Sequence, residues 1–148
     1  MTTTMDTNSY RATFPKTIGT LDITTCATGK LTYNTLTGCS KLSTAGANGS
    51  EYTHLGAFPM VGTSATQVTL LYSPDGTACA GPIASTTLSA FATTTAGTLQ
   101  TAAFLNADGT QISESSPLRL PANGQLWVQI GATQTAPGVA VVAQRRDL

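Results

Sequence analysis

Turn dipeptides that contain glycine recur along the chain at short intervals. Asn-Gly occurs at residues 48–49 and 123–124, and Asp-Gly at 75–76 and 108–109. These dipeptides readily adopt the positive φ angles of tight hairpin turns. Between the turns lie about eight short segments rich in β-branched and aromatic residues, such as QVTLLY and QLWVQI. Short strands at this spacing predict an all-β sandwich or barrel.

The composition favours the same fold class. Threonine makes up about a fifth of the 148 residues, and its stiff, β-branched side chain suits a pleated, half-exposed surface. Charged residues make up 9%, against roughly 25% in ordinary soluble domains. We therefore expect a surface covered mainly by Thr, Ser, Gln and Asn. A chain of this length is expected to form one domain around one core.

Apolar residues at alternate positions indicate which strand faces are buried. Two segments carry this pattern, with Val68, Leu70 and Tyr72 in one and Leu126, Val128 and Ile130 in the other. The last segment, 139–143, is apolar on both faces, which predicts a central or covered strand. The best helix candidate, 84–103, is interrupted by TTTAG, so we interpret it as strand and loop.

A mild change in pattern falls near STAGANGS, at residues 43–50. The sequence before it is rich in Thr and Gly, and the sequence after it shows more regular strand patterning. We therefore divide the chain into an N-terminal arm or extra hairpin, residues 1–42, and a β-sandwich body, residues 43–148. The arm or hairpin is expected to pack on the body.

The charges give no reason to expect nucleic acid or membrane as a partner. Seven basic residues balance seven acidic ones, so no net field attracts phosphate or anionic lipid. The chain contains no apolar run of transmembrane length, and its first residues do not follow a signal-peptide pattern. The sequence predicts a soluble protein made in the cytoplasm.

Residues typical of catalytic and metal sites are sparse. His54 is the only histidine, no serine lies in GxSxG, and no cysteines form CxxC. The three cysteines are expected to be free thiols, although a bridge between Cys26 and Cys39 remains possible. We expect no catalytic residues, no metal and no cofactor. A small hydrolase using His54 is the weakest alternative, because no second catalytic group accompanies it.

Trp127 is the most informative single residue. The alternation that buries its neighbours turns Trp127 outward between Gln125 and Gln129. An outward Trp is covered by another part of the same chain or anchors a partner. The charged residues at the end of the chain either make polar contacts with a partner or form a solvated strand end that discourages pairing with another strand. The candidate interface therefore comprises Trp127, Gln125, Gln129, Arg145, Arg146 and Asp147.

The order of four segments from residue 43 to the end resembles a known family. TAGANGS, VGTSATQVTLLYSPDGT, TTLSAFATTTAG and PLRLPANGQLWVQIGATQTAPGVAVVAQRRDL together are similar to head decoration, or cement, proteins of tailed bacteriophages. The resemblance implies a jelly-roll-like β-sandwich that forms a homotrimer. It also implies binding to the major capsid protein, at three-fold sites on the outer surface of the virion. Residues 1–42 match this scheme less well.

A phage tail, baseplate or fibre-associated β-module is the main alternative. Such a module could carry a carbohydrate-binding face around Trp127, Tyr72 or Tyr52. Labelling on tails rather than heads would favour this alternative.

Overall fold

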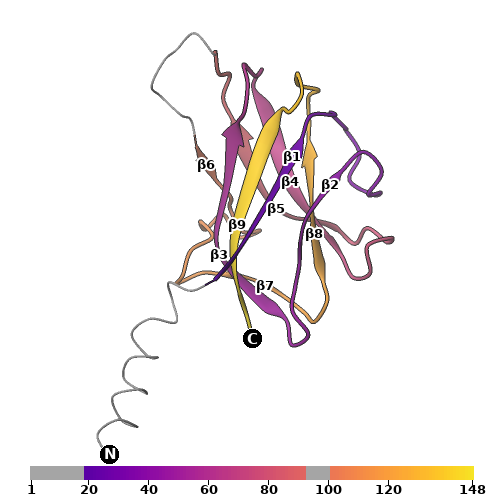
Figure 1. Ribbon diagram of the computed structural model, residues 1–148, viewed down its shortest axis with the longest axis vertical. Helices are drawn as coiled ribbons and strands as arrows, with labels where there is room; N and C mark the ends of the chain where they lie inside the picture. Colours follow the sequence, from indigo (N-terminus) through magenta and orange to yellow (C-terminus); the bar gives the residue numbers. More distant parts are fainter. Residues whose placement is uncertain (1–18, 93–100) are drawn as a thin grey trace, which may run out of the picture.

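The computed structural model describes residues 19–92 and 101–148, and in this part of the chain the protein is all-β without a helix (Figure 1). The described residues form nine strands in two antiparallel sheets. The strands are β1 (Thr20–Cys26), β2 (Ser40–Thr44), β3 (Ser50–Pro59), β4 (Thr66–Ser73), β5 (Gly81–Leu88), β6 (Ala102–Ala103), β7 (Leu118–Leu120), β8 (Gln125–Ile130) and β9 (Val139–Asp147). The expected all-β class, with two facing sheets, is confirmed.

The first sheet is built around the C-terminal strand. Its order is β1-β9-β3-β6, and β7 also pairs with β3. β9 lies between β1 and β3, so Val141 is paired with Thr24 on one side and Ala57 on the other. A bulge between Tyr52 and His54 shifts the register of β3 against β9. The last segment is thus a central strand, as its two apolar faces indicated.

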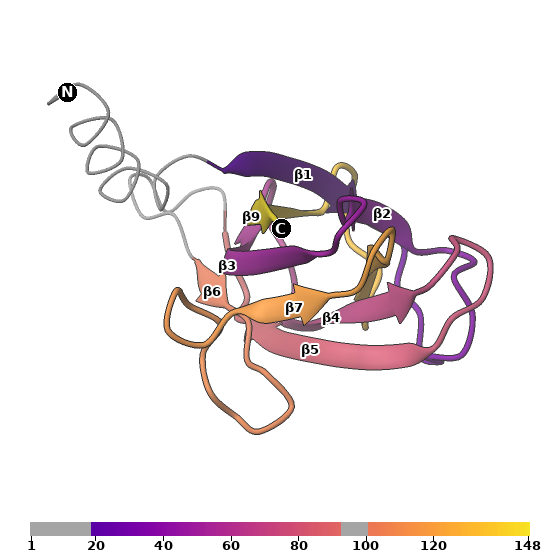
Figure 2. The ribbon, with the colours of Figure 1, turned by 90° about the horizontal axis from the view of Figure 1, so that it is seen from below.

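The second sheet has four strands in the order β2-β8-β4-β5. β8 is central, and Leu126 and Val128 are paired with Tyr72 and Leu70 of β4. Seen from below, the two sheets lie one over the other, with β1 and β2 close together along one side (Figure 2). We call them the β9 sheet and the β8 sheet.

The core lies between the facing sides of the two sheets. Five of the six side chains predicted from the alternation are fully buried there, and Phe104 and Tyr52 join them. Tyr72 is only partly buried but packs against this cluster. Burial of each large apolar side chain contributes about 1.5–3 kcal/mol. Binary patterning therefore predicted the inner faces of β4 and β8 correctly.

The Asn-Gly and Asp-Gly turns form as expected, with one difference. Gly49 has a φ of 94°, and a Cβ there would lie 2.7 Å from the Leu120 carbonyl oxygen. Gly76 has a φ of 85°, and Asp75 Oδ1 accepts hydrogen bonds from the two backbone N–H groups that follow the turn. In the ANGQ turn the positive φ, 59°, belongs to Asn123 rather than to the glycine.

The structure places residues 20–26, part of the expected arm or hairpin, inside the sandwich. β1 pairs with β9 over its whole length, and the boundary expected at residue 42 falls within β2. Residues 1–18 of the expected arm lie outside the described residues. In the segment considered for a helix, β5 ends at Leu88, and residues 93–100 also lie outside them. Among the described helices and strands there is no helix that could span a membrane.

Candidate interaction surfaces

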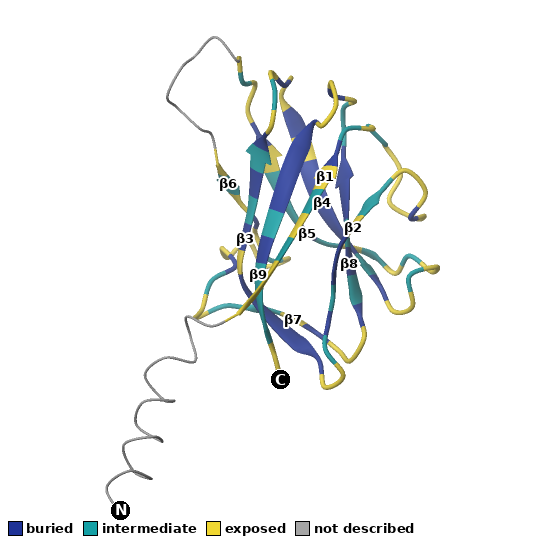
Figure 3. Ribbon diagram, viewed as in Figure 1, coloured by how far each residue is buried: buried dark blue, intermediate teal, exposed yellow. Residues whose placement is uncertain are grey.

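β1 turns its apolar side to solvent. Leu21 and Ile23 are 61% and 59% exposed, whereas Asp22, between them, points toward the opposite sheet. The inner position of Asp22 is fixed by hydrogen bonds from Ser43 Oγ of β2 and from Arg145 Nε of β9. β1 therefore remains open on its outer side beside the buried β9 (Figure 3). Large apolar side chains exposed together typically mark an interaction site.

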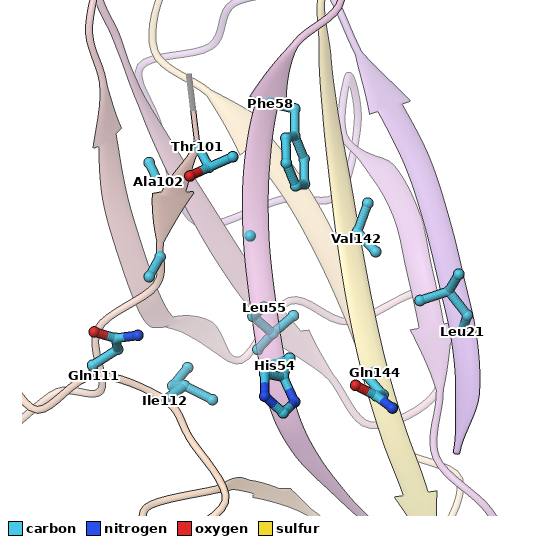
Figure 4. Close-up of a pocket in the computed structure, with 12 residues that line it drawn as sticks. Leu21, His54, Leu55, Phe58, Thr101, Ala102, Gln111, Ile112, Val142 and Gln144 are labelled. Carbon is cyan, nitrogen blue, oxygen red and sulfur yellow. The ribbon is translucent and has the colours of Figure 1, made fainter. Parts of the chain in front are cut away.

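A shallow hollow of about 350 Å³ continues this outer face across the β9 sheet. Figure 4 shows Phe58 of β3 and Val142 of β9 along its length, with Leu21 of β1 on one side and Ala102 of β6 on the other. Gly56 lies on β3 between His54 and Phe58, where the absence of a side chain deepens the surface. We call Leu21, Ile23 and the residues of this hollow the outer apolar face.

His54 lies at the rim of the outer apolar face. Its Nδ1 is 3.1 Å from Thr53 Oγ1, and the nearby polar lining is formed by Gln111 and Gln144. Among the described residues that line the hollow, none is a carboxylate, cysteine or lysine. Within the same described part of the chain, no three His, Cys, Asp or Glu residues gather as metal ligands.

The charged chain end forms ion pairs within the protein. Arg146 and Arg119 both bind the nearly buried Glu51 carboxylate, and Arg119 Nη2 lies 2.8 Å from Glu51 Oε1. The hydrogen bond from Arg146 is the main cause that lowers the pKa of Glu51. Arg146 therefore fastens β9 to β3.

Arg145 and Asp147 belong to a second network on the inner side of the same strand. Arg145 bridges Asp22 and Asp147, and Ser50 donates a hydrogen bond to Asp147. That bond, followed by the one from Arg145, lowers the pKa of Asp147. Tyr52 lies next to this network with its hydroxyl 2.7 Å from Ser43 Oγ, and burial raises the pKa of Tyr52. Arg145, Arg146 and Asp147 thus all have partners within the chain.

In the other half of the candidate interface, Gln129 is covered by the chain itself. Gln129 faces the outer side of the β8 sheet, as alternation predicts, but it is only 1% exposed because residues 27–39 cover it. Its Nε2 donates to the Lys30 carbonyl, and its Oε1 accepts from Cys39 Sγ. We call residues 27–39 the covering loop. Gln129 is therefore not available to a partner.

The three aromatic residues considered for sugar binding do not form one exposed face. Trp127 is half-buried, and its indole N–H donates to Gln125 Oε1 at 3.0 Å. Tyr52 is fully buried between the sheets, and Tyr72 is partly buried against the core. Only Tyr52 is therefore fully withdrawn from the surface, whereas Trp127 and Tyr72 are each partly exposed.

Sequence reasoning missed Leu21 and Ile23 as surface residues. The segment TLDITT has the β-branched composition of a strand, and its alternation places Leu21 and Ile23 on one side and Asp22 on the other. Such a pattern normally assigns the apolar side to the core. The opposite side of this strand carries polar residues, and this could have signalled that the assignment should be reversed. Such residues can face the core only if distant strands supply buried partners for them.

Comparison with protein-family models, with curated proteins and with solved structures finds no match to this chain. The fold and surfaces therefore define the class: a two-sheet, all-β protein with a charge-poor exterior and an apolar outer face.

Proposed function

We propose that this chain is a non-enzymatic virion structural protein, a decoration or cement protein of a tailed-phage head. It would form a jelly-roll-like sandwich with an N-terminal arm and assemble as a homotrimer. The trimer would bind the major capsid protein on the outside of the shell, at three-fold sites. The order of motifs from residue 43 to the end supports this family, and the resemblance alone supplies the three-fold symmetry.

The observation that carries the proposal is the outward apolar side of β1. An exposed Leu21 and Ile23, continuous with the hollow around Phe58 and Val142, suit a permanent contact in which charge is depleted. A stable contact requires roughly 800 Å² from each partner, so two side chains are insufficient and the whole outer apolar face must take part. We assign this face to the contact between subunits of the trimer.

A trimer also explains how a small charge-poor domain could hold a shell. Each subunit needs only a modest affinity for the capsid protein, because the second and third contacts form at high effective concentration. Such binding does not require a deep pocket or a catalytic group. A single subunit would bind the capsid protein weakly. The bound trimer would hold the shell against outward pressure.

The direct test is binding to mature, expanded heads of the phage whose genome encodes this chain. We expect near-saturating occupancy of three-fold sites for the wild-type protein, measured by cosedimentation and by electron microscopy. Leu21→Glu combined with Ile23→Glu should abolish this binding, and Leu31→Glu, a change at an exposed loop leucine, should preserve it. Failure of the wild-type protein to bind heads, or antibody labelling on tails, would refute the proposal.

A further inference from the structure

A second hollow, of about 380 Å³, lies on the outer side of the β8 sheet, away from the outer apolar face. Its floor includes Thr69 of β4 and Ser85 of β5, which are paired in register. Tyr33 of the covering loop and Gln67 of β4 contribute to one side. Leu105 and Asn106 contribute to another, next to β5, because Leu105 and Ser85 exchange backbone hydrogen bonds.

The hollow is lined by both apolar and polar side chains, all of them uncharged. Tyr33 supplies an aromatic ring with 36% of its surface exposed, and Gln67 and Asn106 supply amides. Thr69 and Ser85 add hydroxyl groups, which can donate or accept. None of the described residues that line the hollow is charged. The lining thus combines apolar surface with neutral hydrogen-bonding groups.

The hollow is held in shape by contacts from several parts of the chain. The Tyr33 hydroxyl lies 3.4 Å from Gln67 Oε1, and the Tyr33 carbonyl accepts from Cys79 Sγ at 3.2 Å. The Asn106 amide donates toward Ser116, which fixes its orientation. These contacts keep the aromatic ring and the two amides on the same side of the sheet. A preformed site loses less free energy to ordering when a ligand binds.

The chemistry of the lining selects among ligand classes. An anionic ligand would need a cation, and the ammonium group of Lys30, in the covering loop, is bonded to Thr35 at 2.6 Å. A wholly apolar ligand would desolvate the amides and hydroxyls without replacing their hydrogen bonds. A sugar ring has apolar C–H faces that match an aromatic ring and hydroxyl groups that match amides. We propose that this hollow binds a neutral oligosaccharide.

The proposal is tested by following backbone amide signals of the full chain by NMR during titration. Cellohexaose and maltohexaose serve as neutral probes, and polygalacturonate as an acidic one. We expect one neutral probe to shift signals of Tyr33, Gln67, Ser85 and Asn106 at millimolar concentration or below. Tyr33→Ala should weaken that binding by about tenfold or more. Tyr33→Phe should weaken it less, because the ring remains.

Thr87→Ala is the matched control, because Thr87 is exposed on β5 but does not line the hollow. It should leave the affinity unchanged, and signals remote from the hollow should show that every variant is folded. The proposal is overturned if neither neutral probe shifts these signals at millimolar concentration. It is equally overturned if Tyr33→Ala binds as well as the wild type, or if polygalacturonate binds more tightly than both neutral probes. The test does not depend on whether the protein binds phage heads.

Discussion

Asp22 of β1 and Arg145 of β9 form an ion pair of 2.8 Å, with only 19% and 16% of their side chains exposed. Together with the hydrogen bond from Ser43 Oγ to Asp22, it ties β1 both to its neighbour strand and to the opposite sheet. The pair supports the register of β1 against β9 in which Asp22 points inward and Leu21 and Ile23 face outward. It links the stability of the fold directly to the proposed interface.

Replacement of Asp22 by Asn should therefore destabilise the protein. Arg145 would keep Asp147 as a partner, so we expect a loss of about 1–2 kcal/mol in the free energy of unfolding rather than the full cost of an unpaired buried charge. Urea denaturation measures this loss. Glu114→Gln, at an exposed carboxylate, is the control and should change stability by less than about 0.5 kcal/mol. Equal stability of the Asp22→Asn variant and the wild type would contradict the assigned role.

Stability should also fall in acid, because Glu51 and Asp147 have pKa values lowered by their partners in the folded state. A carboxylate with a lowered folded pKa stabilises the fold above its unfolded pKa, which is 4.5 for Glu and 3.8 for Asp. That contribution is lost as the pH falls through the lower folded value. The free energy of unfolding, measured by denaturation from pH 7 to about pH 3, should thus be constant above about pH 5 and decline below it.

The Glu51→Gln variant isolates one part of this acid sensitivity. It cannot lose a proton-linked contribution from residue 51, so its stability should be lower at neutral pH and should decline less steeply in acid. Denaturation of the variant over the same pH range provides the comparison. A decline as steep as that of the wild type would show that Glu51 does not contribute to the acid sensitivity.

Gln129 should act as the anchor of the covering loop. The side-chain amide of Gln129 forms hydrogen bonds with the Lys30 carbonyl and with Cys39 Sγ. Gln129→Ala is therefore expected to increase backbone hydrogen exchange across residues 30–39. Gln111→Ala removes an exposed amide elsewhere and should leave that exchange unchanged. Undiminished protection in Gln129→Ala would mean that other contacts hold the loop.

The three thiols should differ in reactivity. All three cysteines are free, but Cys26 is buried and burial raises its pKa, which lowers the fraction of reactive thiolate. Cys79 is more accessible. A thiol-specific reagent at mildly alkaline pH should modify Cys79 in the native protein and Cys26 only on unfolding, as peptide mass mapping can show. Rapid native modification of Cys26 would contradict its position in the core.

The sequence predicted those parts of the fold that depend on local pattern. Alternation assigned the inner faces of β4 and β8 because their apolar side chains, such as Leu70 and Val128, face the core. The outward side of Gln129 was also predicted correctly. Its burial was not, because the Lys30 carbonyl that covers it lies 99 residues away in the chain. Sequence pattern reports which side of a strand a residue occupies but not what covers that side.

The orientation of β1 shows the same limit more clearly. Asp22 is tolerated on the inner side only because Arg145, 123 residues later, lies beside it. No local rule predicts such a pairing, so the candidate interface built from the chain end included residues that pair within the molecule. The outward position of Leu21 and Ile23, on which the proposed interface rests, became identifiable only when the register of β1 and β9 was known.

The absolute mass of the protein in solution, measured by light scattering after size exclusion, tests the central claim most directly. We predict a trimer of about 45 kDa, three times the 15.1 kDa of one chain. Leu21→Glu combined with Ile23→Glu should reduce it to a folded monomer, and Leu31→Glu should remain trimeric. A wild-type monomer, or a trimer that persists in the double variant, would contradict the assignment of the outer apolar face to subunit contact.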